Sequence, residues 1–128
     1  MDQLCPLVED FVSSFQFDVA SFKATFGKLL ADDGAVILVA ESNNSIVGYC
    51  LGFVHDTFYA NGPVAWLEEI MVRSDCRRSG LGERLIHEFE VWARKQGAVL
   101  CALATRRAAE FYRALGYEES ATYFRRLL

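Results

Sequence analysis

The sequence predicts an α/β fold in which helices cover the faces of a mixed β-sheet. Four apolar runs of strand length are separated by polar or glycine-rich connections. Two segments with apolar residues at helical spacing precede these runs, and a long amphipathic segment separates the last two. Hydrophobic residues make up 52% of the 128 residues, which is enough for one compact core. We therefore expect a single domain that spans residues 1–128.

The N-terminal part predicts two helices. Apolar residues recur at helical spacing over 2–16, and Pro6 is tolerable in a first helical turn. A second helix is expected to begin after an Asp18 N-cap and to continue through Leu30, before Asp32-Asp33-Gly34 ends it. The first expected element of the chain is thus a helix.

Three strands are expected next, at 35–40, 45–54 and 64–72. The sequence SNNS between the first two indicates a hairpin turn, because asparagine tolerates a positive φ angle. Gly48 and Gly52 interrupt the second strand, which indicates β-bulges or a close approach of another group to the backbone.

The C-terminal half continues with a helix, a strand, a short helix and further strands. The helix is expected over 82–96, with Gly97 as its stop, and the buried strand over 99–104. A short helix over 108–115 follows, and 117–128 offers one or two more strands. One face of the long helix carries Leu85, Phe89, Trp92 and Ala93.

Charge is divided unevenly along the chain, whose net charge is −4. Residues 1–69 hold two Lys and ten Asp or Glu, a net −8, whereas residues 70–128 hold eleven Lys or Arg and seven Asp or Glu, a net +4. The acidic total argues against a nucleic-acid partner. The division suits a protein that handles an anionic partner on one side and a cationic partner on the other.

Several classes of protein are disfavoured. No signal-peptide pattern and no membrane-length apolar run occur, so we expect a soluble, cytoplasmic protein without a membrane partner. The four cysteines form no C-x-x-C pair, so neither a zinc site nor a disulfide framework is expected, and no metal is predicted.

The stretch RRSGLG, residues 77–82, lies between an expected strand and the long helix. A helix N-terminus presents unpaired backbone N–H groups and a partial positive charge. Glycines let a ligand approach this backbone, and Arg77 and Arg78 add full charges. The stretch therefore predicts a cradle for a phosphate or pyrophosphate. It is neither the dinucleotide fingerprint, which needs a third glycine, nor a GxxxxGK phosphate loop.

The same residues carry a resemblance. Residues 77–82 match the pattern Arg/Gln-x-x-Gly-x-Gly/Ala of the GCN5-related N-acetyltransferase (GNAT) superfamily, and AAEFYRALGYEE is similar to its A-x-x-F-Y-x-x-x-G-F/Y segment. The resemblance runs from about Ala35 to the C-terminus and implies the GNAT acyl-CoA N-acyltransferase fold. The usual first strand is apparently lacking. An uncovered sheet edge is an aggregation liability, which favours a homodimer or a rearranged edge.

The resemblance implies acetyl-CoA as cosubstrate. Backbone amides from Arg78 to Glu83 would hold its pyrophosphate, and the strand before the loop would pair with its pantetheine arm, with one N–H polarising the thioester carbonyl. Thr105 stands where the family often places an asparagine that contacts the cofactor. The implied cofactor-binding residues are Ile70, Met71, Val72, Arg77, Arg78, Ser79, Gly80, Leu81, Gly82, Glu83 and Thr105.

Two side chains are implied as catalytic. Tyr112 stands where the family often places a tyrosine near the thioester sulfur, and it would protonate the departing thiolate. Glu68 is the candidate base or amine anchor, because similarity of WLEEIMV to polyamine and aminoglycoside acetyltransferases favours it over Glu69. Strand alternation places Glu68 with Ile70 and Val72 on one face, although a bulge would reverse this facing.

The expected function is N-acetyl transfer from acetyl-CoA to a primary amine by direct attack. A small cationic amine suits the acidic N-terminal half and the Glu68-Glu69 pair. Two alternatives remain: a protein or peptide N-acetyltransferase, and a catalytically inactive acyl-CoA-binding module.

Overall fold

The structure is a computed structural model of residues 1–128, and it describes every residue except 13 and 14. Its helices and strands, in chain order, are α1 (Leu4–Phe11), α2 (Val19–Leu30), β1 (Ala35–Ser42), β2 (Ser45–His55), β3 (Val64–Val72), a 3₁₀ turn η1 (Ser74–Cys76), α3 (Leu81–Lys95), β4 (Leu100–Leu103) and α4 (Ala109–Ala114). Across the described residues, no helix is both long and apolar enough to cross a membrane.

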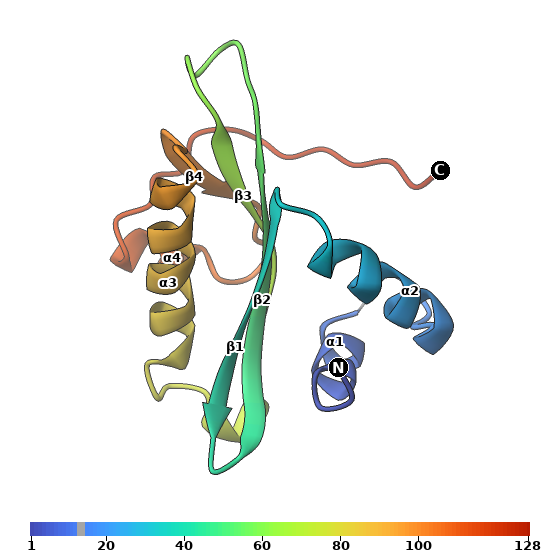
Figure 1. Ribbon diagram of the computed structural model, residues 1–128. Coiled ribbons are helices and arrows are strands. Elements are labelled where there is room, and N and C mark those ends of the chain that lie inside the picture. The colour runs from blue at the N-terminus through green and yellow to red at the C-terminus, as the bar shows by residue number, and fades with distance from the viewer. Residues whose placement is uncertain (13–14) are drawn as a thin grey trace.

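The four strands form one mixed sheet in the order β1-β2-β3-β4. β1, β2 and β3 are antiparallel neighbours, and β4 runs parallel to β3. Figure 1 shows α3 and α4 on one side of this sheet and α1 and α2 on the other. The α/β class with a mixed sheet, predicted from the sequence, is therefore confirmed.

Local sequence signals fix several boundaries. The Asp18 carboxylate caps α2 by accepting a hydrogen bond of 3.1 Å from the backbone N–H of Ser21, as predicted. The β1–β2 hairpin turns at Asn43 and Asn44, whose φ angles are 49° and 65°. These positive angles give a hairpin turn the twist of its flanking strands, and asparagine adopts them readily.

Each face of the sheet has its own apolar core. On the α3 side, Leu85, Phe89 and Ala93 of the helix pack with Cys50 and Leu67 of the strands. On the α1 side, a smaller cluster joins Leu4 and Leu7 of the helix to Tyr49 of β2. Side chains on β2 and β3 alternate between the two cores, so both strands are buried on both faces.

Gly52 marks a bulge in the β2–β3 ladder, as its position within a strand predicted. Leu51 pairs with Glu69 and Gly52 pairs with Leu67, so Glu68 has no partner on β2. A Cβ atom on Gly52 would lie 2.2 Å from the Phe89 ring. Only glycine therefore lets α3 lie this close to the sheet.

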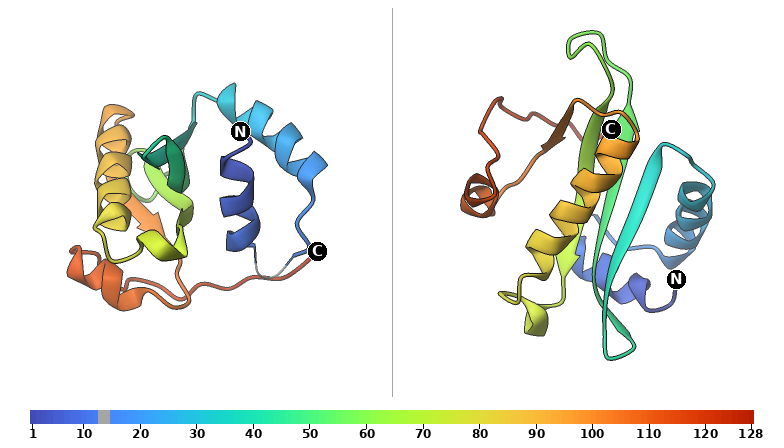
Figure 2. Two further views of the ribbon diagram at one scale, coloured as in Figure 1. Left: turned by 90° about the horizontal axis from the view of Figure 1, so that it is seen from below. Right: turned by 60° about the vertical axis from the view of Figure 1, so that its left-hand side comes forward.

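Two sequence predictions are wrong in extent. No strand forms within 117–128, where Tyr123 and Phe124 are 61% and 87% exposed. A strand requires a neighbour's edge, and Figures 1 and 2 show this tail running on from α4 and crossing toward the side of α1 and α2. The first helix is also shorter than the predicted 2–16, because it ends at Phe11. Positions 13 and 14 of that prediction lie outside the described residues.

Candidate active site

β3 loses its parallel neighbour halfway along its length. The β3–β4 ladder pairs Val64 with Leu100 and ends where Leu67 pairs with Leu103. From Glu69 to Val72, β3 is paired with β2 on one side and with no described residue on the other. A strand edge of this kind presents unpaired N–H and C=O groups, which an extended ligand can meet as a further strand would.

Two backbone amides point toward this open edge. The N–H of Arg73 donates to the Val47 carbonyl of β2 at 2.7 Å, so Arg73 faces β2. Neighbouring residues of a strand point their N–H groups to opposite sides. The N–H of Met71 therefore also points toward β2, whereas the N–H groups of Ile70 and Val72 point toward the open edge. Of the three predicted amides, this geometry favours those of Ile70 and Val72.

The open edge leads into the N-terminus of α3. Gly80 precedes the helix at a φ of 85°, and no side chain caps the first turn. The N–H groups of Leu81, Gly82 and Glu83 thus have no partner within the helix, and the helix dipole adds partial positive charge there. The Ser79 hydroxyl donates to the carbonyl of Cys76 and does not cap the helix.

The two loop arginines have different surroundings. The Arg77 Nε donates to the Val72 carbonyl at 3.0 Å, so this side chain is folded back along the end of β3. Arg78 is exposed, has a φ of 64° and forms no ion pair within the described part of the chain. Arg78 is therefore the loop cation that remains available to an anionic ligand.

The remaining predicted cofactor residues lie around this cradle. A Cβ atom on Gly82 would come 3.4 Å from the Phe111 ring of α4, so the first turn of α3 lies in contact distance of α4. Glu83 is exposed in the first turn of α3. Thr105 accepts a hydrogen bond of 3.1 Å from the Ala108 N–H, which stabilises the turn before α4. Uncapped amides, a glycine start and a free arginine fit a pyrophosphate.

Tyr112 is 7% exposed and belongs to the core on the α3 side, together with Cys50 and Ile70. Its ring packs edge-on against Tyr117, with ring centroids 5.8 Å apart. Burial raises the pKa of Tyr112, and Cys50 adds to this rise. Its hydroxyl has no hydrogen-bond partner among the described residues. Every fully enclosed side-chain oxygen of those residues has such a partner, so the Tyr112 hydroxyl is not fully enclosed. The hydroxyl therefore reaches solvent and is free to donate a proton.

The bulge separates the two glutamates of β3. Glu68 is the unpaired, exposed residue at the point where β4 ends. Leu67 packs in the core on the α3 side and Met71 packs in the core on the α1 side, although simple alternation puts both on one face. Glu69 therefore faces the α1 side and lines a cavity there, and Glu68 does not line it.

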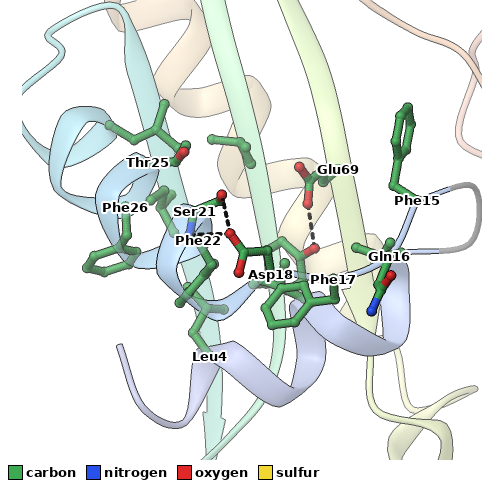
Figure 3. A pocket seen from close by; sticks show the side chains of 16 residues that line it. Leu4, Phe15, Gln16, Phe17, Asp18, Ser21, Phe22, Thr25, Phe26 and Glu69 are labelled. Atoms are coloured by element: carbon green, nitrogen blue, oxygen red, sulfur yellow. Dashed lines mark hydrogen bonds between the residues drawn. The ribbon is translucent and has the colours of Figure 1, made fainter. Parts of the chain in front are cut away.

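Glu69 accepts a hydrogen bond of 2.7 Å from the Tyr49 hydroxyl, drawn as a dashed line in Figure 3. Burial raises the pKa of Glu69 and outweighs the lowering effect of this bond, while Glu68 adds a further rise. Burial and the neighbouring Glu69 also raise the pKa of Tyr49. Sequence reasoning did not single out Tyr49, because an aromatic residue inside an apolar strand reads as a core residue.

The cavity lies between α1, α2 and the sheet and has a volume of about 330 Å³. Its acidic and polar side chains are those of Glu69, Asp18, Tyr49, Gln16, Ser21 and Thr25. Ten further lining residues are apolar, and Figure 3 shows Phe17, Phe22 and Phe26 among them, on and beside α2. No lysine, arginine or histidine is among its described lining residues.

Other reactive side chains do not join this site. Burial raises the pKa of the Cys50 thiol to about 12, so it stays protonated and unreactive at neutral pH. His55 and His87 are both exposed, at the end of β2 and on α3. Within the described residues, no group of three or more His, Cys, Asp or Glu side chains is arranged to hold a metal ion.

With this geometry in place, comparison identifies the class of protein. Residues 4–117 match the family described as "Acetyltransferase (GNAT) family". The chain therefore belongs to the GNAT acetyltransferase family, and the resemblance drawn from its loop and α4 motifs is confirmed. Acetyl-CoA is the cosubstrate of this family, and the family needs no metal.

Curated relatives narrow the comparison. The chain is 34% identical over 108 residues to an aminoglycoside N(6')-acetyltransferase type 1 of Stenotrophomonas maltophilia, which covers 75% of this chain and 69% of the relative. It is 37% identical over 78 residues to the enzyme of the same description from Acinetobacter genomosp. 13. That match covers 53% of each chain, so this chain spans only about half the length of that relative.

Solved structures share the fold. The apo aminoglycoside 6'-N-acetyltransferase AAC(6')-Ig of Acinetobacter haemolyticus aligns with a TM-score of 0.80 at 25% identity, over 99% of this chain and 92% of that one. AAC(6')-Iy, solved with a bisubstrate analogue of CoA and acetylneamine, aligns with a TM-score of 0.83 at 20% identity, over 99% of this chain and 91% of that one. A protein described as a transcriptional regulator from Bacillus halodurans aligns with a TM-score of 0.90 at 22% identity, over 99% of this chain and 92% of that one. The last two show the fold alone.

Proposed function

We propose that this chain transfers the acetyl group of acetyl-CoA to the primary amine of a small cationic acceptor. The observation that carries the proposal is the open edge of β3. At one end it meets the uncapped N-terminus of α3, and at the other it carries Glu68 and Glu69. The edge thus joins a place for an anionic, extended cosubstrate to a pair of carboxylates.

The cosubstrate is held mainly by backbone. The first amides of α3 bind the pyrophosphate, and Arg78 adds a full charge. The pantetheine arm lies along β3 from Val72 toward Glu68. The N–H of Ile70 or Val72 then donates to the thioester oxygen and stabilises the negative charge that develops as the carbonyl is attacked.

Proton transfer completes the reaction. An alkylamine has a pKa near ~10 and is protonated at neutral pH, so it must lose a proton before it attacks. Glu68, at the end of the β3–β4 ladder, takes this proton directly or through water. The nitrogen–carbon bond forms, the carbon–sulfur bond breaks, and the Tyr112 hydroxyl protonates the departing thiolate. The nitrogen loses its second proton as the amide forms, and this proton restores the Tyr112 hydroxyl through water.

Charge supports a cationic acceptor. The N-terminal 69 residues, which build α1 and α2 and supply all the described lining residues of the cavity, carry a net −8. The relatives from Stenotrophomonas and Acinetobacter are described as acting on aminoglycosides, which are cationic amines. A peptide acceptor would need an open groove, whereas α1 and α2 lie over this face of the sheet and line the cavity.

The assembly and the compartment are also proposals. Tyr123, Phe124, Leu127 and Leu128 of the tail are exposed, and no described strand pairs with the outer edge of β4. These surfaces support a homodimer in which a second copy covers them. Cytoplasmic localisation stays a prediction from the sequence.

An amine panel tests the proposed reaction. The purified protein is incubated with acetyl-CoA and polyamines, aminoglycosides, arylalkylamines, amino acids and short peptides, and the products are read by mass spectrometry. We expect an acetylated small amine. Acetylation of peptides alone would replace the acceptor class. No product at all, with CoA bound in a parallel titration, would favour the inactive binding module.

A further inference from the structure

The cavity beside β3 has an unusual balance of chemistry for an acceptor site. Ten of its sixteen lining residues are apolar, and its volume of about 330 Å³ is near the lower end of the range for small-molecule sites. The Phe22 ring of α2 lies 6.0 Å from the ring of Phe17, which precedes the helix, and 5.9 Å from the ring of Phe26, measured between centroids. One wall is therefore a continuous aromatic surface.

Glu69 supplies the anionic group at the sheet side of this cavity. Its Oε1 accepts the bond from Tyr49, which fixes the orientation of the carboxylate. Its Oε2 has no hydrogen-bond partner among the described residues. Every fully enclosed side-chain oxygen of those residues has a partner, so Oε2 is accessible from the cavity or from solvent. Oε2 is thus free to accept a hydrogen bond from a group that enters the cavity.

The second carboxylate of the cavity, that of Asp18, already accepts hydrogen bonds within the protein. Both the backbone N–H and the hydroxyl of Ser21 donate to Oδ2 of Asp18, which caps α2. These bonds lower the pKa of Asp18, so the cap is charged at neutral pH. Asp18 is exposed at the rim, whereas Glu69 is half-buried, so Glu69 is the better partner for a desolvated ammonium group.

We propose that the acceptor is a monoamine with an apolar body, such as an aryl or branched alkyl group. The body fills the cavity against Phe17, Phe22 and Phe26, and Glu69 binds the amine. Tyr49 is a positioning residue that acts through Glu69. This inference rests on the proposed acetyl transfer, because it names the substrate class of that same site.

The apolar wall argues against an acceptor rich in hydroxyl groups. Burying a hydroxyl without a hydrogen-bond partner is unfavourable, and the cavity offers few partners besides Glu69, Gln16 and Thr25. A linear polyamine has the same difficulty with its additional charges, because only one carboxylate of the cavity is both half-buried and open. An aryl or branched alkyl group needs no such partners.

Kinetics with three amines test the substrate class. We compare kcat/KM for 2-phenylethylamine, spermidine and kanamycin at saturating acetyl-CoA. We expect the value for 2-phenylethylamine to be at least about tenfold higher than the other two. A higher value for kanamycin or spermidine would overturn the inference and leave the proposed acetyl transfer intact.

Two variants test the anchor. Glu69→Gln should raise KM for 2-phenylethylamine about tenfold or more, and Tyr49→Phe should raise KM with little change in kcat, while neither changes the Kd of CoA. Glu41→Gln, an exposed glutamate near the β1–β2 turn, is the matched control and should change nothing. Unchanged KM in Glu69→Gln would overturn the role of Glu69.

Direct binding separates this inference from the proposed reaction. Binding of 2-phenylethylamine is measured by NMR titration in the presence of CoA, for the wild type and for Glu69→Gln. Binding that depends on Glu69, without any acetylated product, would support the inference and contradict the proposed function. Absence of binding to the wild type would overturn the inference.

Discussion

Tyr112 combines a buried ring with a hydroxyl that is free to react. The ring packs with Tyr117 and the core on the α3 side, so removing only the hydroxyl leaves the packing in place. We expect Tyr112→Phe to lower kcat about tenfold or more, in line with general acid catalysis, with little change in the Kd of CoA. Steady-state kinetics and a CoA titration check this. An unchanged kcat would remove Tyr112 from the mechanism.

The raised pKa of Glu69 predicts how the stability of the protein depends on pH. Burial raises its pKa in the folded protein, whereas the unfolded chain has the ordinary value. The folded state therefore binds this proton more readily, and the contribution of Glu69 to stability falls as pH rises from the ordinary pKa through the raised one. Glutamine keeps an acceptor for Tyr49 and does not titrate.

We therefore expect Glu69→Gln to gain stability relative to the wild type between about pH 4 and about pH 7. Urea unfolding of both proteins at the two pH values measures the difference. A difference in unfolding free energy that does not change with pH, or that changes in the opposite direction, would show that the folded state does not raise this pKa.

Single residues also show what sequence reasoning can reach. Asn43, Asn44 and Asp18 were predictable because their side chains and backbone preferences act on neighbouring residues. The side of Glu69 was not predictable, because the bulge at Glu68 depends on the register between two strands. Tyr49 gave no signal, since its partner lies 20 residues away.

At the scale of elements, two glycines should respond in opposite ways to the same change. Gly27 lies inside α2, and a Cβ there meets nothing within 4 Å. Gly27→Ala should stabilise the protein by about 0.5–1 kcal/mol, through the helix preference of alanine. Gly52→Ala should destabilise it by about 1–3 kcal/mol, because the Cβ would meet Phe89 of α3.

Thermal and urea unfolding of the two variants provide the measurement, and each variant is the control for the other. A stable Gly52→Ala protein would mean that α3 can move away from β2 without a loss of stability.

The order of helices and strands was predictable from periodicity and from helix stops such as Gly97 and Gly116, which have φ angles of 82° and 93°.

The whole molecule leaves an apolar tail uncovered. Tyr123, Phe124, Leu127 and Leu128 are all exposed, and the outer edge of β4 has no strand partner within the described part of the chain. The sequence predicted strands here because the tail has suitable residues, but a strand needs an edge to pair with, which local sequence does not specify. This surface supports the proposed homodimer.

Light scattering coupled to size exclusion tests that assembly. We expect a mass of about twice the 14.4 kDa of one chain. Phe124→Ser, at an exposed position of the tail, should shift the mass toward one chain, whereas Glu41→Gln should not. A wild type with the mass of one chain would contradict the dimer.

Hydrogen–deuterium exchange by NMR, with and without CoA, tests most directly that the open edge of β3 holds the cosubstrate. CoA should slow exchange of the Ile70 and Val72 amides and of the first amides of α3. Met71, which already faces β2, is the internal control and should not change. Added protection at Ile70 and Val72 would place the pantetheine arm along β3, and its absence while CoA is bound would contradict this binding mode.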